Sequence, residues 1–399
     1  RCIQWAREFM PVLTGIEADF QKAKPFEGLR IAMCVHMEAK TAYLALVLRA
    51  GGAEVRITGS DPLSTKDDIC AALDADGIEV HGWFGATEDE YREHLRRTLE
   101  FCPHIIIDDG GELVSMLLGD HPEYAQDLIG GCEETTTGVR RLRSLAANGK
   151  LHFPMLDVND ADSKRLFDNR HGTGQSVWNA VMCATNNMIT GRTVVVAGYG
   201  FCGSGIAQRA KGLGANVIVT EVNPHRALEA AMDGHRVLTM DEAASLGDIF
   251  ITATGCKDVI CSRHFEKMKH NAILANAGHF DVEVSKEDLR TMAVSIKNQK
   301  PFIDGYVLAD GRVLNLMADG RPVNIVAGNG HPADIMDMSF ALQALCAQYL
   351  AQEGGALRPG LYSVPAGIDE AVAQRKVEAM GLCLDRLTPA QEEYLKGGF

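Results

Sequence analysis

The segment from Thr193 to Glu221 constrains this 399-residue chain more than any other stretch of its sequence. A short apolar run is followed by Gly198, Gly200 and Gly203 at the spacing GxGxxG, then by a helical pattern and a second apolar run, Val217–Val219. This order predicts a strand, a tight turn, a helix and a second strand, the unit that binds the pyrophosphate of a dinucleotide at a helix N-terminus. The segment therefore predicts a parallel sheet with a dinucleotide cofactor.

Each glycine of this unit has its own predicted task. Gly198 allows the tight turn, Gly200 lets the backbone approach the pyrophosphate, and Gly203 lets the helix pack closely on the strand. Glu221 follows the second strand, where a carboxylate accepts hydrogen bonds from a ribose 2′-OH and repels the extra phosphate of NADP. We therefore expect NAD as the cofactor. The alternative, a glycine-rich turn without a ligand, does not account for the full order of strand, glycines, helix, strand and acid.

Composition excludes several classes of protein. An apolar content of 46% with 23% charged residues is ordinary for a globular protein, and 399 residues suffice for two or three domains. The net charge of −14 argues against nucleic acid as a partner. Eleven scattered cysteines without a CxxC pair indicate reduced thiols, so we expect no disulfide framework and no metal site. With no signal-peptide pattern and no long apolar segment, we expect a cytoplasmic protein that does not enter a membrane.

Apolar and amphipathic segments alternate along both halves of the chain, which predicts repeated βα units and parallel, doubly wound sheets. In the first half, we expect strands at residues 29–36, 51–58, 78–83, 104–109 and 151–159, and helices at 41–50, 66–75 and 88–100. The second half continues the dinucleotide unit with apolar segments at 248–255 and 272–279, after a helix at 168–189.

The expected fold class is therefore α/β, with two doubly wound, Rossmann-like domains and a helical C-terminal tail. A substrate-binding domain would span residues 1–165 and be completed by about 333–360. An NAD-binding domain would span residues 166–332. Residues 361–399 would form a tail used for oligomerisation.

Titratable and polar residues gather where the predicted strands end, the place where open α/β sheets bind ligands. They are His36, Asp109, Glu134, Asn159, Lys164, Asp168, His279 and His331. One strand-end aspartate often only caps a helix, and one histidine is often a satisfied core residue. Their common placement favours a catalytic site.

The motifs around these residues resemble S-adenosyl-L-homocysteine hydrolase, from about Met10 to the C-terminal tail. The resemblance is carried by Val35–Met37, Asp108–Gly111, Glu133–Gly138, Val158–Asp160, Lys164, Phe167–Asn169, Val196–Gly200, Gly278–Asp281 and Gly330–Pro332. It implies reversible hydrolysis of an S-nucleosyl-L-homocysteine to L-homocysteine and a nucleoside, which clears the by-product of methyl transfer. In this family a trapped NAD oxidises the ribose at C3′, homocysteine leaves as a thiolate, water adds at C5′, and the ketone is reduced again. The resemblance also implies a cytoplasmic homotetramer.

The resemblance implies roles for named residues. Lys164 and Asp168 would act at the 3′-OH, and burial would let the lysine lose its proton near neutral pH. Glu134 would hold the ribose hydroxyls and support Lys164. Asp109 and His36 would handle the proton of the leaving sulfur and of the incoming water. The remaining catalytic residue implied is His279.

The resemblance also implies two sets of binding residues. Substrate would be bound by Glu38, Lys40, Thr41, Asn159 and His331, the last meeting the purine. NAD would be bound by Thr135, Thr136, Thr137, Asn169, Gly198, Gly200, Phe201, Cys202, Gly203, Glu221, Thr254, Gly278 and Asn324. The sequence departs from the family at Thr173, where a cysteine is usual, so no redox role is expected for that position.

A second departure concerns the purine. The family's adenine-recognition pattern is His-x-Thr-x-Glu or Gln, whereas this chain has His36-Met-Glu38-Ala-Lys40. A lysine that donates to O6 and a glutamate that accepts from N1–H suit hypoxanthine and mispair with adenine. At this pattern the chain resembles the S-inosyl-L-homocysteine hydrolases, so we expect inosine as the product. The alternatives are a solvated Glu38–Lys40 ion pair with the purine recognised elsewhere, and adenosine as the product.

Two other readings of the whole chain compete with the hydrolase. An NAD-dependent dehydrogenase with net redox turnover shares the tandem layout, but it does not explain the Glu133–Gly138 segment together with Lys164 and Asp168. A catalytically silent NAD-binding regulatory protein of this family would have lost catalytic residues and gained a serine-rich N-terminal extension. This sequence shows neither change, so the hydrolase is favoured.

Overall fold

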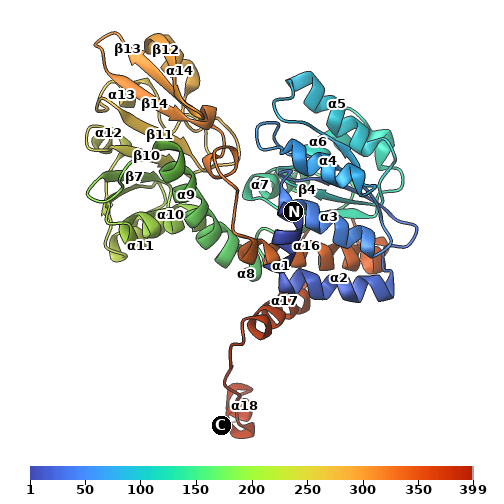
Figure 1. The fold of residues 1–399 in the computed structure, drawn as a ribbon. Coiled ribbons are helices and arrows are strands. Elements are labelled where there is room, and N and C mark those ends of the chain that lie inside the picture. Colours follow the sequence, from blue (N-terminus) through green and yellow to red (C-terminus); the bar gives the residue numbers. More distant parts are fainter. Residues whose placement is uncertain (398–399) are drawn as a thin grey trace.

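The computed structural model describes residues 1–397 and places them in two units, each built on its own sheet (Figure 1). Within these residues the strands of the first sheet all run parallel. Their order is β15 (Gly360–Ser363), β6 (Pro154–Asp157), β5 (Gly130–Glu133), β4 (Ile105–Asp108), β1 (Arg30–Cys34), β2 (Glu54–Thr58) and β3 (Glu79–His81). The chain builds outward from β1 to β3 and then from β4 toward β6, so the strand order reverses between β1 and β4. Ligands bind at such a reversal point in doubly wound folds.

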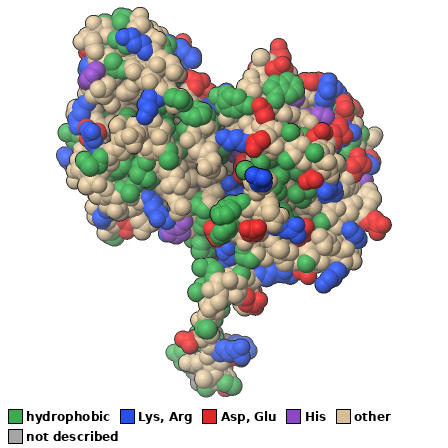
Figure 2. Space-filling model, viewed as in Figure 1, with side chains coloured by type: hydrophobic (Ala, Val, Ile, Leu, Met, Phe, Trp, Pro, Cys, Tyr) green, Lys and Arg blue, Asp and Glu red, His purple; other side chains and the backbone are tan. Residues whose placement is uncertain are grey.

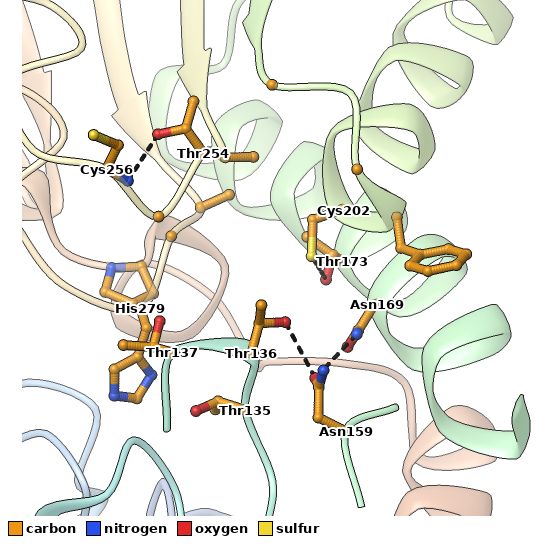
Figure 3. A pocket seen from close by; sticks show the side chains of 18 of the residues that line it. Thr135, Thr136, Thr137, Asn159, Asn169, Thr173, Cys202, Thr254, Cys256 and His279 are labelled. Atoms are coloured by element: carbon orange, nitrogen blue, oxygen red, sulfur yellow. Dashed lines mark hydrogen bonds between the residues drawn. The ribbon is translucent and has the colours of Figure 1, made fainter. Parts of the chain in front are cut away.

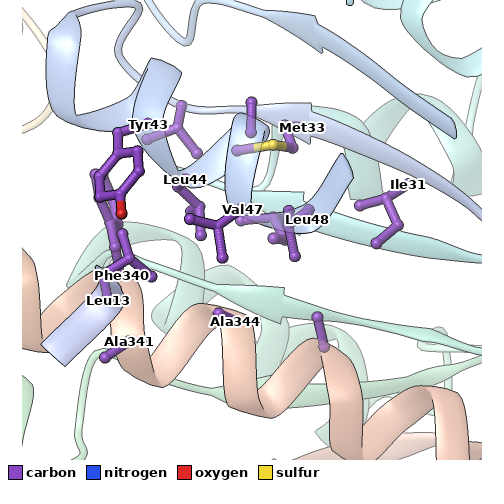
Figure 4. Packing of buried hydrophobic residues seen from close by; sticks show 14 of the residues in the cluster. Leu13, Ile31, Met33, Tyr43, Leu44, Val47, Leu48, Phe340, Ala341 and Ala344 are labelled. Carbon is purple, nitrogen blue, oxygen red and sulfur yellow. The ribbon is translucent and has the colours of Figure 1, made fainter. Parts of the chain in front are cut away.

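Helices cover both faces of the first sheet because successive residues of its strands point to opposite sides. One face carries α1 (Cys2–Glu8), α2 (Pro11–Ala23), α3 (Ala39–Ala50), α4 (Asp67–Ala75), α16 (Ala333–Glu353) and α17 (Ala366–Ala379). Figure 4 shows part of this core, where Leu13, Met33, Leu44 and Phe340 meet. The other face carries α5 (Glu88–Leu99), α6 (Glu112–Leu118) and α7 (Thr136–Ala147).

The second sheet has the order β12 (Ala293–Lys300), β13 (Ile303–Leu308), β14 (Val313–Met317), β11 (Ala272–Asn276), β10 (Ile249–Thr252), β7 (Thr193–Ala197), β8 (Asn216–Thr220) and β9 (Arg236–Val237). Its strands are parallel except β13, which runs antiparallel to both neighbours. The strand order reverses between β7 and β10. The glycine-rich turn follows β7, so it lies at the reversal point of its own sheet.

The helices of the second unit also form two layers. One core cluster includes α9 (Thr173–Thr185), α10 (Phe201–Gly212), α11 (Pro224–Met232) and α15 (Val323–Val326), and the other includes α12 (Met240–Ala243), α13 (Ser262–Phe265) and α14 (Lys286–Met292). Short 3₁₀ turns complete the chain at Pro122–Ala125, Ala318–Gly320 and Gly354–Ala356. The two layers enclose the sheet on both sides, which confirms the predicted α/β class.

Two segments connect the units. The first is the π-helix η2 (Arg165–Gly172), which continues from α8 (Asp162–Lys164) into α9. The second is the stretch 327–332, which leads from α15 back to α16. π-helical turns inside α-helices often mark functional sites, and this one contains Asp168 and Asn169.

The C-terminal tail predicted from residue 361 begins later than expected. β15 pairs with β6 in the first sheet, and Lys376 on α17 forms a 2.9 Å ion pair with the buried Asp337 on α16. Residues 360–379 therefore belong to the first unit. α18 (Pro389–Leu395) lies apart from both units, as Figure 1 and Figure 2 show. The segment before it exposes Leu382, Leu384 and Leu387.

Most predicted strands and helices of the first half are present, with ends shifted by a few residues. The prediction missed β5, β9, β15 and the strands β12 to β14, of which β13 is antiparallel to its neighbours. No helix within residues 1–397 is long and apolar enough to cross a membrane.

Candidate active site

A cavity of about 1480 Å³ lies between the two units, at the carboxyl ends of both sheets. The residues predicted for catalysis, for substrate and for cofactor all line this cavity, except Gly203. Figure 3 shows part of the lining, with Thr135 to Thr137 and Asn159 from the first unit facing Thr254 and His279 from the second. Sequence positions more than 200 residues apart are thus brought to one site.

The glycine-rich turn has the shape that a dinucleotide requires. Gly198 has φ +93°, and a Cβ at this position would lie 2.7 Å from the carbonyl oxygen of Ala253. A Cβ on Gly203 would overlap the carbonyl of Gly198, which explains why Gly203 serves packing and does not line the cavity. At Gly200, by contrast, the nearest atom to a Cβ would be the Arg226 guanidinium at 3.3 Å. The backbone at Gly200 therefore faces space at the start of α10.

Two further groups fit the remaining parts of NAD. The Glu221 carboxylate accepts hydrogen bonds from the backbone N–H groups of Tyr199 at 2.7 Å and Asn223 at 2.9 Å, which fix it at the cavity rim beside the glycine turn. Asn324 donates to Ser176 through Nδ2, while its buried Oδ1 has no hydrogen-bond partner within residues 1–397. A buried amide oxygen without a partner favours a ligand that donates a hydrogen bond there, as a carboxamide does. The chain's own residues therefore fit the cofactor that the sequence predicts.

Lys164 lies between two carboxylates at the end of α8. Its Nζ is 3.4 Å from Glu134 Oε1 and 3.4 Å from Asp168 Oδ1, and it donates to Asn169 Oδ1 at 2.8 Å. Asn169 in turn donates to Asn159 Oδ1 at 3.1 Å. All these side chains are buried, so the cluster is a water-poor set of one ammonium, two carboxylates and two amides.

The charges in this cluster decide its proton affinities. Burial raises the pKa of Glu134 to about 7, and the Lys164 ammonium opposes that rise. Burial alone would lower the pKa of Lys164, but the carboxylates of Asp168 and Glu134 outweigh it and raise this pKa above its usual value. Burial likewise disfavours ionised Asp168, yet Lys164 and His331 outweigh burial and hold its pKa below the usual range. The expectation that burial lets Lys164 lose its proton near neutral pH was wrong, because its two carboxylate neighbours hold the charge.

Helix α16 and the second connecting segment orient the two carboxylates. Gln343 Nε2 donates to Glu134 Oε2 at 2.6 Å, and Ser339 Oγ donates to Asp168 Oδ2 at 2.7 Å. His331 Nδ1 lies 3.0 Å from Asp168 Oδ1. Asp168, on the first connecting segment, is thus held by His331 of the second connecting segment and by Ser339 of α16. Sequence reasoning missed Ser339 and Gln343, although two polar residues four positions apart on an apolar helix mark one polar face.

A second acid–base group lies at the reversal point of the first sheet. His36 Nε2 is 3.6 Å from Asp109 Oδ2, and His279 Nδ1 is 3.8 Å from Asp109 Oδ1. Burial lowers the pKa of His279, which the Asp109 carboxylate opposes. His36 and Asp109 follow β1 and β4, whereas His279 comes from the second unit. This histidine pair therefore spans the two units.

Glu38 and Lys40 form an ion pair on the cavity wall. Lys40 Nζ is 2.5 Å from Glu38 Oε2, and the two side chains are only 9% and 13% exposed. Lys40 Nζ also donates to the carbonyl oxygen of Asn329 at 3.0 Å, and Glu38 caps α3 by accepting from the backbone of Lys40 and Thr41. The Glu38–Lys40 ion pair that one alternative predicted is present, but it is largely buried and not solvated. Its capping role was not predicted.

Thr173 stands where the family usually has a cysteine, and its hydroxyl contacts the thiol of another cysteine, Cys202. Thr173 Oγ1 lies 3.7 Å from Cys202 Sγ of the glycine-rich segment (Figure 3), and it lies 3.2 Å from His331 Nε2. Burial raises the pKa of the Cys202 thiol. A neutral thiol therefore packs against the hydroxyl that replaces the usual cysteine.

A dinucleotide turn facing a buried lysine–carboxylate cluster and a histidine–aspartate group is the arrangement of an NAD-dependent α/β enzyme with two groups of ionisable side chains in one cavity. Residues 1–121 match the family model described as S-adenosyl-L-homocysteine hydrolase, and residues 169–330 match its NAD binding domain. The chain belongs to the S-adenosyl-L-homocysteine hydrolase family. It is accordingly a hydrolase of an S-nucleosyl-L-homocysteine that uses NAD, which confirms the predicted family, enzyme class and cofactor.

Relatives that match nearly the whole chain at about half identity carry two names. The chain is 53% identical over 395 residues to an S-inosyl-L-homocysteine hydrolase of Methanopyrus kandleri, covering 99% of this chain and 93% of that protein. It is 53% identical over 394 residues to an adenosylhomocysteinase of Thermococcus kodakarensis, covering 99% and 94%. An S-inosyl-L-homocysteine hydrolase of Methanocaldococcus jannaschii is 52% identical over 396 residues, covering 99% and 95%. The names of the relatives therefore leave two purines possible.

Proposed function

We propose that the protein catalyses the reversible hydrolysis of S-inosyl-L-homocysteine to L-homocysteine and inosine. The Glu38–Lys40 pair supports this purine. Two of the three N–H donors of Lys40 are used by Glu38 and by the Asn329 carbonyl, and within residues 1–397 the third has no partner. That donor suits the O6 acceptor of hypoxanthine, and the Glu38 carboxylate suits the N1–H donor. Adenine has an amino group at position 6, so two donors, this group and the Lys40 ammonium, would face each other. A buried site of this kind should therefore reject adenine.

We assign the ribose end of the substrate to the Lys164 cluster. NAD, when bound, supplies the oxidation of C3′ and the later reduction of the ketone. The chain's own task is to take the proton of the 3′-OH. Because the pKa of Glu134 is about 7 while that of Lys164 is raised, Glu134 is the group that can take up this proton near neutral pH, and the Lys164 ammonium stabilises the substrate oxygen as the proton leaves. Asp168, held ionised by Lys164 and His331, keeps Lys164 in place between the two carboxylates.

We assign the C5′ end to His36 and Asp109. Asp109 takes the C4′ proton through its Oδ1, which has no hydrogen-bond partner within residues 1–397. The electron pair of the C4′–H bond forms the C4′=C5′ double bond, and the sulfur leaves with the electron pair of the C5′–S bond. Water then adds its oxygen to C5′ and loses one proton to His36, while Asp109 returns its proton to C4′. His36 passes its proton on to the thiolate. The buried Asp109 carboxylate, 3.6 Å from His36 Nε2, stabilises the imidazolium formed in between.

We assign the cofactor to the second unit and to the loop that begins α7. The residues that would hold it are Thr135, Thr136, Thr137, Asn169, Gly198, Gly200, Phe201, Cys202, Glu221, Thr254, Gly278 and Asn324. Thr135 is the N-cap of α7 and accepts from the backbone of Gly138 at 3.1 Å, so the helix cap orients this threonine at the cavity. We further propose a cytoplasmic homotetramer joined in part by the exposed leucines of residues 380–397.

The test offers S-inosyl- and S-adenosyl-L-homocysteine separately to the purified enzyme and follows thiol release with a thiol reagent. We expect kcat/KM for the inosyl compound to exceed that for the adenosyl compound by at least about 10²-fold, as a polar recognition site permits. Equal or faster turnover of the adenosyl compound would remove the hypoxanthine assignment and leave the hydrolase intact. Light scattering of the same sample checks the oligomeric state.

A further inference from the structure

The loop from Ser60 to Ser64, between β2 and α4, contacts catalytic residues of the first unit and the body of the second. Ser64 Oγ lies 2.7 Å from His36 Nδ1, and Ser60 Oγ donates to Asp109 Oδ2 at 3.1 Å. Ser60, Asp61 and Ser64 are all buried. No part of this loop was predicted to be functional.

The contacts of Ser64 determine which nitrogen of His36 carries the proton. Ser64 Oγ donates to the carbonyl oxygen of Asp61 at 2.9 Å. Because a serine hydroxyl has a single proton, its contact with His36 Nδ1 must be one in which the imidazole donates. Neutral His36 then has its proton on Nδ1, and its Nε2 carries a lone pair. That lone pair faces the cavity beside Asp109, where a general base must present it.

Ser60 has the matching effect on Asp109. Its hydroxyl satisfies Oδ2, the oxygen nearer to His36, while Oδ1 is buried and has no hydrogen-bond partner within residues 1–397. The nearest cationic candidate to Oδ1 is His279 of the second unit. One loop therefore aligns both members of the proton-transfer pair.

The same loop is held from the second unit. Asp61 Oδ2 forms a 2.5 Å ion pair with Arg321 Nη1, and Asp61 Oδ1 accepts from the backbone of Leu63 at 2.7 Å. The Leu63 side chain packs against the core cluster of the second unit. The other charges near Arg321 are Asp281 and Asp319, and both pair with Lys286. Asp61 is thus the partner of Arg321 across the units, and its carbonyl is the acceptor that orients Ser64.

We propose that the Ser60–Ser64 loop is a positioning element that couples the approach of the two units to the orientation of His36. When Arg321 holds Asp61, the Asp61 carbonyl turns the Ser64 hydroxyl so that His36 presents an unprotonated Nε2 to the C5′ end of the substrate. Ser64, Asp61 and Arg321 are positioning residues, since none of them is assigned a contact with the reacting atoms. The inference rests on the proposed roles of Lys164 at C3′ and of His36 at C5′.

The test separates the two ends of the reaction in the cofactor-loaded enzyme. Absorbance of enzyme-bound reduced nicotinamide reports the C3′ step, and thiol release reports the C5′ step. In Ser64→Ala we expect thiol release to fall on the order of 100-fold, the lower range of general acid–base effects, while bound reduced nicotinamide forms at a rate within about 3-fold of wild type and accumulates. Equal loss of both signals would overturn the proposal by showing general damage to the site.

Thr65→Val is the matched control. Thr65 Oγ1 also donates to the Asp61 carbonyl, at 3.1 Å, but it does not touch His36. We expect both signals to stay near wild type in this variant. A loss in Thr65→Val as large as in Ser64→Ala would contradict the proposal, because loop stability alone would then explain the effect.

Asp61→Asn and Arg321→Gln test the coupling between the units. Small-angle scattering with substrate should show a larger radius of gyration for each variant than for wild type, and each should repeat the accumulation of reduced nicotinamide. A compact variant with normal thiol release would contradict the coupling. If wild type itself shows neither reduced nicotinamide nor thiol release, the proposed function fails, which is a result distinct from failure of this inference.

Discussion

Gln343 on α16 donates a 2.6 Å hydrogen bond to the Glu134 carboxylate that follows β5, so two segments more than 200 residues apart set the proton affinity of one buried acid. This bond lowers the pKa of Glu134, against the larger effect of burial, which raises it to about 7. In Gln343→Met the donor is lost and the pKa of Glu134 should rise further. Because Glu134 must be ionised to accept the proton of the 3′-OH in the proposed mechanism, activity should increase as pH rises through this pKa.

The variant should therefore shift the rising limb of the kcat–pH profile to higher pH, by about one unit. The measurement is thiol release at saturating substrate between pH 5.5 and 9. Gln374→Met on the exposed face of α17 is the control, since the Gln374 side chain donates to the nearby Glu378 and, within residues 1–397, makes no other side-chain hydrogen bond. An unchanged midpoint in Gln343→Met would show that Glu134 does not govern the reaction.

The strands that sequence reasoning found are those with continuous apolar runs, such as Val194–Val196 in β7, which parallel sheets bury on both faces. β12 was missed because its sequence, Ala293–Lys300, is polar and nearly all exposed, with no apolar period to detect. β5 was missed because Gly130 and Gly131 resemble a loop. They are glycines because a Cβ at Gly131 would collide with Ile106, so close packing and not chain reversal requires them.

The candidate site was predictable where the residues follow strands, because the carboxyl ends of parallel strands share one edge. The structure gathers His36, Asp109 and Lys164 in this way. It could not be predicted which side chains orient them, since Ser64 and Gln343 reach the site only through tertiary packing. The direction of the pKa shift of Lys164 was unpredictable for the same reason, because it depends on two neighbours and not on burial alone.

Exchange of the purine-recognition pair should change the substrate. In the double variant Glu38→Thr with Lys40→Gln, the chain takes the pattern that the family uses for adenine. Threonine still caps a helix N-terminus, so α3 should remain stable. We expect kcat/KM for S-adenosyl-L-homocysteine to rise relative to the inosyl compound by about 10²-fold or more. Competition between the two substrates, followed by chromatography of the nucleoside products, measures the ratio. A constant ratio would place purine recognition elsewhere.

Removal of the Glu221 carboxylate should weaken the cofactor and relax its selection. Glu221→Ala loses a charged acceptor for the ribose hydroxyls, which is worth roughly 1.5–3 kcal/mol, or about 10- to 100-fold in Kd. NADP should lose less affinity than NAD, because the repulsion of its extra phosphate disappears. Titration calorimetry on cofactor-stripped protein provides both constants. Glu229→Ala on α11, outside the cavity lining, should leave both constants unchanged. Parallel losses for the two cofactors would refute a role in discrimination.

The buried ion pair between Asp337 and Lys376 should stabilise the fold far more than an exposed pair on the same helix. Asp337 is fully buried and also accepts from the backbone of Leu13 at 2.9 Å, so it joins α16, α17 and α2. Lys376→Ala leaves this carboxylate without its cation, a change that costs about 3–5 kcal/mol in buried pairs. Arg375→Ala is the control, because its ion pair with Asp19 is exposed at both ends and is worth about 0–1 kcal/mol.

Urea unfolding, followed by circular dichroism, measures both variants. We expect a clear fall in the transition midpoint for Lys376→Ala and almost none for Arg375→Ala. Water weakens the exposed Arg375–Asp19 attraction and solvates Asp19 when the arginine is removed. Asp337 is buried, so water does not solvate its carboxylate when Lys376 is removed. Equal midpoints for the two variants would mean that the Asp337–Lys376 pair does not contribute to the stability of the first unit.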